Sequence, residues 1–157
     1  MNTQSDIILS HLYRSADNSG WIVQSNRDHC RGVAELAADF CGEFGARGWG
    51  ALAGLMHDRG KEAREFQNYI RTASGYDTNV KSYNDKGHSH IGAIIVERKF
   101  RDPAHTIANA IAGHHRGLYD HDELEAVLSK SVPEEVDTTL PDILPDKLNL
   151  WATKRSV

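Results

Sequence analysis

Histidines stand at the ends of the apolar segments of this sequence, and this placement limits the folds that the chain can adopt. The segments and their histidines are 49–56 with His57, 88–100 with His88, and 103–115 with His114 and His115. A histidine at the end of an apolar helix can point its ring into the centre of a helical bundle, where facing helices assemble metal sites. We therefore expect an all-α, compact helical bundle whose helix ends converge on one site.

Helical patterns account for most of the chain. The predicted helices cover residues 26–44, 49–58, 61–71, 88–100, 103–115 and 120–130, with a short helix at 7–12. In the first long helix an apolar stripe with three- and four-residue spacing is expected to face the core, with His29 on it and Asn26 as its cap. That stripe consists of Val33, Leu36, Ala37, Phe40 and Phe44.

The remaining segments read as turns and loops. A turn is expected at residues 17–20, a helix stop at Gly60, a polar rim or lid at 72–87, and an extended tail beyond Val132. No stretch shows the strict alternation of apolar and polar residues that is typical of a half-buried strand. The sequence thus predicts no sheet.

Composition favours one domain without disulfides. The 157 residues are 39% hydrophobic and 25% charged, which is ordinary globular usage, so we expect a single domain over 1–157. Cys30 and Cys41 lie about 16 Å apart along the predicted helix, too far for a disulfide. No apolar run approaches the roughly 20 residues that span a bilayer, which predicts a cytoplasmic protein without membrane contact.

The net charge of −4 is a poor match for a polyanion, because nucleic-acid affinity comes largely from Lys and Arg that neutralise phosphates. Any DNA is therefore expected to be held locally or delivered by a partner protein.

The pair His57-Asp58, followed by Gly60 and Lys61, is the strongest candidate for chemistry. Neighbouring side chains on a helix project about 100° apart, so Asp58 could bridge two metal ions while His57 binds one. Lys61, one turn later, could pair with Asp58 or with a substrate phosphate. Ligation rich in imidazole suits transition metals better than a site built only from oxygens.

Isolated histidines carry a plainer interpretation as hydrogen-bonded or exposed residues. The second such pair, His121-Asp122, has no apolar approach and no following Gly-Lys, so it reads as a solvated helix start. His11 and His105 are likewise interpreted as structural or exposed.

The order of motifs between residues 21 and 118 resembles the HD nuclease family of type I CRISPR systems, within the HD phosphohydrolase superfamily. The matching pieces are DHCRGVAELA around His29, GLMHDRGKEAREFQNYI around His57, HSHIGA from His88, and AIAGHHRGL around His114. Members occur as a stand-alone HD nuclease or as the HD domain of the CRISPR helicase-nuclease.

This resemblance implies a metal-dependent endonuclease that hydrolyses single-stranded DNA in CRISPR-mediated defence against foreign DNA. It implies two divalent transition metal ions, Mn, Ni, Co or Fe with Mg as an alternative, and as partners a separate helicase and a CRISPR surveillance complex. The catalytic residues would be Asp58 and Lys61. The implied ligands are His29, His57 and Asp58 for one metal, and Asp58, His88, His114 and His115 for the other.

His88 rather than His90 occupies the motif position, and because the two lie two residues apart on a helix they cannot both bind the metal.

One departure from the family is the missing aspartate on a late helix that completes the first metal's ligands. Asp142 and Asp146 stand in proline-broken sequence and are poor substitutes, so the first metal site is expected to be weak. Two other functions stay open: an HD nucleotide phosphohydrolase, and a catalytically impaired, metal-bound module that recruits a helicase or a surveillance complex.

Overall fold

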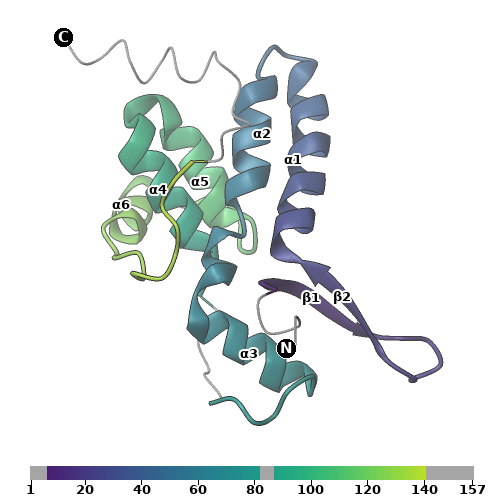
Figure 1. Ribbon diagram of the computed structural model, residues 1–157. Coiled ribbons are helices and arrows are strands. Elements are labelled where there is room, and N and C mark those ends of the chain that lie inside the picture. Colours follow the sequence, from purple (N-terminus) through teal and green to yellow (C-terminus); the bar gives the residue numbers. More distant parts are fainter. Residues whose placement is uncertain (1–6, 82–86, 141–157) are drawn as a thin grey trace.

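The computed structural model describes residues 7–81 and 87–140, which form helices and one short two-stranded sheet (Figure 1). The expected mostly helical architecture is confirmed. In chain order the elements are β1 (Leu9–Arg14), β2 (Trp21–Ser25), α1 (Asn26–Gly42), α2 (Arg47–Met56), η1 (Arg59–Glu62), α3 (Arg64–Ser74), α4 (Ser89–Phe100), η2 (Asp102–Ala104), α5 (His105–Gly113) and α6 (His121–Leu128). None of these helices is long and apolar enough to cross a membrane.

The antiparallel hairpin of β1 and β2 corrects two expectations, the short helix at 7–12 and the absence of strands. An irregularity in register between Leu9 and His11 breaks the period-two alternation, which is why the strand signal is missing from the sequence. The backbone of Leu9 is bound from α3: its N–H donates to Gln67 Oε1, and Gln67 Nε2 donates to its carbonyl, both at 2.9 Å. The predicted turn is confirmed, with Asn18 at φ 57°.

Helix α1 turns a different face to the core from the predicted one. Its buried residues are Asn26, Cys30, Ala34 and Ala38, whereas Leu36, Phe40 and Phe44 are 61%, 72% and 73% exposed. The predicted cap is also wrong, because Ser25 rather than Asn26 caps the helix and accepts from the Asp28 N–H.

Small residues explain this choice of face. A Cβ atom added at Gly54 of α2 would lie 2.4 Å from the Cα of Ala34, and one added at Gly50 would lie 2.3 Å from the Ala37 carbonyl oxygen. The two helix backbones are therefore nearly in contact, as Figure 1 shows for the adjacent α1 and α2. No space remains there for a leucine or phenylalanine side chain.

The hydrophobic core lies around α4, in which residues 91–96 are all buried. Leu52 and Met56 of α2, Ile111 of α5 and Leu124 of α6 pack into the same cluster. A Cβ atom at Gly92 would lie 1.8 Å from the Met56 carbonyl oxygen. The first turn of α4 is thus held against the last turn of α2, where the predicted site begins.

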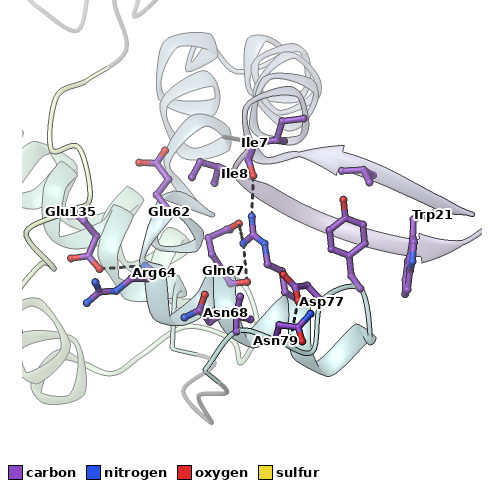
Figure 2. A pocket seen from close by; sticks show the side chains of 14 residues that line it. Ile7, Ile8, Trp21, Glu62, Arg64, Gln67, Asn68, Asp77, Asn79 and Glu135 are labelled. Atoms are coloured by element: carbon purple, nitrogen blue, oxygen red, sulfur yellow. Dashed lines mark hydrogen bonds between the residues drawn. The ribbon is translucent and has the colours of Figure 1, made fainter. Parts of the chain in front are cut away.

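A groove of about 1030 Å³ separates the hairpin from α3 (Figure 2). Arg64, Gln67 and Asn68 contribute polar groups from α3. Trp21 and Tyr76 meet at one end, where their rings pack edge to face with centroids 5.5 Å apart.

Candidate metal centre

All seven predicted site residues lie together at the ends of the helices. His29 comes from the first turn of α1, His57 follows α2, Asp58 and Lys61 surround the start of η1, His88 precedes α4, and His114 and His115 follow α5. Four separate stretches of chain therefore meet at one point, and Asp58, which is 2% exposed, lies at its centre.

One oxygen of the Asp58 carboxylate faces the first group of predicted ligands. Oδ2 lies 3.1 Å from His29 Nε2 and 3.2 Å from His57 Nε2. The two imidazole nitrogens are themselves only 3.1 Å apart. Lys61 Nζ is also 2.8 Å from Oδ2, so this oxygen pairs with the lysine as well as with the imidazoles.

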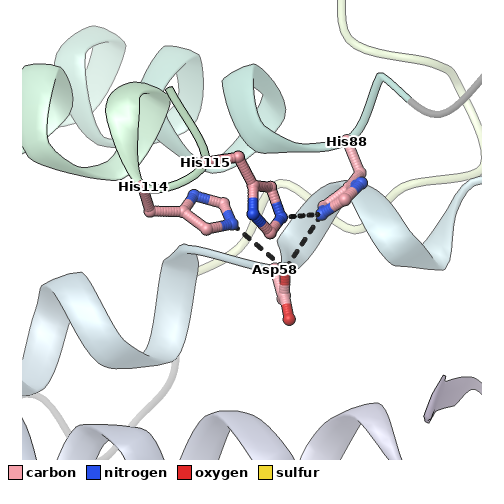
Figure 3. A group of neighbouring side chains, drawn as sticks. All are labelled: Asp58, His88, His114 and His115. Atoms are coloured by element: carbon pink, nitrogen blue, oxygen red, sulfur yellow. Dashed lines mark hydrogen bonds and ion pairs between the residues drawn. The ribbon is translucent and has the colours of Figure 1, made fainter. Parts of the chain in front are cut away.

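The other oxygen faces the second group (Figure 3). Oδ1 lies 3.2 Å from His88 Nε2 and 3.5 Å from His114 Nε2. His115 joins through its Nε2, which is 3.1 Å from that of His88. The carboxylate thus lies between two sets of imidazoles, and each set with Asp58 has the spacing that could hold a metal ion.

Backbone carbonyl groups fix how two of these rings present their nitrogens. His57 Nδ1 lies 2.8 Å from the Gly54 carbonyl oxygen, and His114 Nδ1 lies 2.7 Å from that of Ile111. Because a carbonyl oxygen can only accept, Nδ1 carries the hydrogen in each ring. In a neutral ring Nε2 then turns a lone pair toward Asp58.

This arrangement fits a cation and would be unfavourable without one. Oδ1 of Asp58 is buried and has no hydrogen-bond partner among the described residues, although two imidazole nitrogens face it. Lone pairs and a carboxylate directed at one another are the ligands of a divalent transition metal, with the backbone carbonyls as the outer-shell partners that orient such histidines. The donor set therefore fits the metal that the sequence predicts.

The protonation states agree with metal binding. Burial lowers the pKa of His29 although Asp58 opposes this, and burial with His114 and His88 lowers the pKa of His115. Burial would raise the pKa of Asp58, but the hydrogen-bond donors around its carboxylate, Lys61 Nζ among them, outweigh burial and hold that pKa well below its usual range. Neutral imidazoles and an ionised carboxylate are the forms that bind metals.

Lys61 adopts the first of its two predicted roles, the pairing with Asp58. Its side chain is 5% exposed, and Nζ also donates to Ser10 Oγ at 3.2 Å. Gln67 Nε2 donates to the Lys61 carbonyl oxygen at 2.7 Å. Lys61 is therefore a buried countercharge for Asp58, fixed from β1 and α3.

Gly60 does not end the preceding helix, as the sequence predicted, but has another structural role. Helix α2 ends at Met56, and Gly60 lies inside η1 with its α-carbon against His88. A Cβ atom at this position would lie 2.2 Å from the His88 carbonyl oxygen. The glycine allows the chain that carries Asp58 to touch the chain that carries His88.

His88, not His90, lies in the centre, as the motif position predicts. His88 is buried, whereas His90 lines a separate pocket beside Phe66 and Ile91. Asp142 and Asp146, the weak substitutes for the late aspartate, lie outside the described residues.

Three supporting residues could not be found from the sequence. His11 packs edge to face on His29 with ring centroids 4.6 Å apart, Asn26 Nδ2 donates to the Asp58 carbonyl oxygen at 3.2 Å, and Ser10 holds Lys61. They belong to no motif, and their proximity arises only from the hairpin and the start of α1.

Comparison with known proteins identifies the family. The family model described as the HD domain matches residues 26–138, a range that includes all the residues of the centre. No curated protein matches the chain.

Proposed function

The chain belongs to the HD domain family of metal-dependent phosphohydrolases, and we propose that it is a nuclease that hydrolyses phosphodiester bonds of single-stranded DNA. The observation that carries the proposal is the position of Asp58, with one oxygen toward His29 and His57 and the other toward His88 and His114. A carboxylate placed in this way suits two metal ions, which is the arrangement of many enzymes that cleave phosphate esters.

The narrower assignment rests on the motifs. The order HDxGK, HSxxGA and GHHxGL resembles the HD nucleases of type I CRISPR systems, so we propose a role in defence against foreign DNA. A separate helicase and a surveillance complex are the proposed partners, which would deliver the strand to a protein whose own net charge is −4.

The residues of the centre each have a defined part in this reaction. Bound divalent ions would supply activation of water and stabilisation of the charge on the attacked phosphate. Asp58, ionised and paired with Lys61, would hold both ions in place. His57 and His114 would keep Nε2 turned inward because their Nδ1 hydrogens are engaged by backbone carbonyls.

The groove between the hairpin and α3 is the proposed path of the strand (Figure 2). The guanidinium of Arg14 lies 4.1 Å from the centroid of the Trp21 ring, and Tyr76 packs against the same ring. Aromatic faces combined with arginine are the usual contacts of proteins that bind single strands without reading their sequence.

Cleavage of circular single-stranded DNA tests the proposal, because a circle offers no end to an exonuclease. The metal-free protein is assayed with Mn²⁺, Co²⁺, Ni²⁺, Mg²⁺ or a chelator. We expect cleavage that depends on metal and falls in Asp58→Ala by more than the roughly 10–100-fold that loss of an outer-shell partner costs.

The chain supplies a matched control for this variant. Asp122→Ala removes the aspartate of the second His-Asp pair, which is exposed on α6, and should cleave at the wild-type rate. Equal cleavage by Asp58→Ala and wild type would refute the assignment.

The acidic net charge favours a second candidate, an HD phosphohydrolase that acts on small nucleotides. Release of phosphate or nucleoside from nucleotides, with circular DNA left intact, would replace the nuclease assignment. Binding of metal without turnover of either substrate would instead support the impaired recruitment module.

A further inference from the structure

A second cluster of metal-binding side chains lies away from Asp58, at the opposite end of α5. We propose that His105, His121 and Glu125 form a separate site for a divalent transition metal ion, with Zn²⁺ as the probe, and that this ion fastens α6 to the start of α5. The inference does not depend on the proposed nuclease activity, since none of the three residues belongs to the Asp58 centre.

The geometry brings three ligand atoms close together. One atom from each of His105, His121 and Glu125 lies within 4.8 Å of the other two. His121 and Glu125 are four residues apart on α6 and so share one face of that helix. A tetrahedral Zn²⁺ needs ligand atoms about 3.3 Å apart, and the exposed side chains of His121 and Glu125 can rotate to reach that spacing.

Glu97 of α4 supplies the outer-shell partner that such a site requires. Its Oε2 lies 3.6 Å from His105 Nδ1, is buried, and has no hydrogen-bond partner among the described residues. A carboxylate on one nitrogen of a histidine leaves the other nitrogen to bind the metal and raises its basicity. The same role in the Asp58 centre is filled by the carbonyl groups behind His57 and His114.

Acidic side chains also surround the proposed second site. The carboxylates of Glu97 and Glu125 both lie beside the ring of His105. Carboxylates crowded around two imidazoles attract a cation, because a cation relieves their mutual repulsion.

The position of the site gives it a structural purpose. His105 and His114 are nine residues apart, about 14 Å along α5, so the two sites are distinct. The chain after His115 returns along α5: the Asn109 side chain donates to the Tyr119 carbonyl oxygen at 3.0 Å and accepts from the Tyr119 N–H at 2.9 Å. An ion bound by His105 and His121 would link the start of α5 to the start of α6. It would thereby restrain the intervening segment, which carries His114 and His115.

Zn²⁺ binding by the full chain tests the site. Equilibrium dialysis of the metal-free protein against Zn²⁺, followed by elemental analysis, should find one more ion per chain in the wild type than in His121→Ala. Asp122→Asn, which removes a carboxylate from the neighbouring position, should match the wild type. Equal Zn²⁺ content in His121→Ala and wild type would overturn the proposal.

Thermal unfolding adds a readout that does not involve catalysis. Saturating Zn²⁺ should raise the Tm of the wild type more than that of His121→Ala, because binding to the native state stabilises it. The difference should persist in an Asp58→Ala background, and its absence there would place the ion at the Asp58 centre instead.

Glu97→Gln tests the positioning role of the outer-shell carboxylate. We expect the Zn²⁺ affinity of this site to fall by roughly 10–100-fold, while the Tm of the metal-free protein stays within about 2 °C of the wild type, because a neutral amide fills the same volume. A lower metal-free Tm with unchanged Zn²⁺ affinity would show that Glu97 acts only in packing.

Discussion

The two faces of α1 are built in opposite ways. The inner face presents the small residues Ala34 and Ala38, which are buried, and Ala34 lies against Gly54 of α2, whereas the outer face presents Leu36 and Phe40, which are exposed. The usual rule places bulky apolar residues inside. Here the closeness of the two backbones decides instead, and it lets His29 and His57 come within hydrogen-bonding distance of each other.

The largest effect is expected from a substitution that disrupts the packing of the inner face of α1 against α2. Gly54→Val places a branched side chain where a Cβ alone would lie 2.4 Å from Ala34 Cα, so the helices must separate. We expect a loss that exceeds the roughly 1–3 kcal/mol typical of overpacking, measured by urea unfolding.

The matched control for this variant lies on the outer face. A Cβ atom added at Gly32 meets nothing within 4 Å, so Gly32→Ala should stabilise the protein by up to about 1 kcal/mol through helix propensity. Similar unfolding midpoints for both variants would mean that α1 and α2 are not in backbone contact.

The second prediction is that burial, rather than side-chain size, determines how much an alanine substitution destabilises the protein. Leu52 of α2 is fully buried, and Leu52→Ala should lower the free energy of unfolding by about 2–5 kcal/mol. Phe40→Ala removes a larger side chain from the outer face and should change it by no more than about 0.5 kcal/mol. A large cost for Phe40→Ala would show that something covers that face in solution.

The third prediction concerns the two cysteines, both of which are free. Burial, with the charge of Asp58, raises the pKa of Cys30 to about 12, so its thiolate fraction at pH 8 is about 10⁻⁴ and grows tenfold for each further pH unit. Cys41, at the half-buried end of α1, should therefore react first with a thiol reagent.

Labelling kinetics of Cys41→Ser and Cys30→Ser at pH 7 to 9 check this order. Faster labelling of the Cys30 thiol than of the Cys41 thiol would mean that the inner face opens to solvent.

The sequence predicted the helices and the residues that meet at Asp58 better than it predicted their packing. Histidines at helix ends and the HDxGK order are local signals, so the sequence could group His57, Asp58 and Lys61, and the structure brings these three residues together. Periodicity identifies a stripe on α1 but does not say which stripe faces inward. That choice depends on Gly50 and Gly54 of another helix, which no local pattern reveals.

Supporting contacts escaped prediction for a similar reason. Ser10 and Lys61 are 51 residues apart, and the strand that carries Ser10 has an irregular register that hides it. The cluster of His105 and His121 has no motif, because its members come together only when the chain returns along α5.

The ligands of the Asp58 centre are far apart in the sequence, and from this we expect a particular order of folding. His29 and His57 are 28 residues apart and His88 and His115 are 27 apart, so the ligands converge only after α1, α2, α4 and α5 have docked. Because chain entropy is lost before non-local contacts can form, we expect these contacts to form late in folding. Metal should therefore barely change the refolding rate and should mainly slow unfolding, so the bound ions would determine how long each folded molecule lasts.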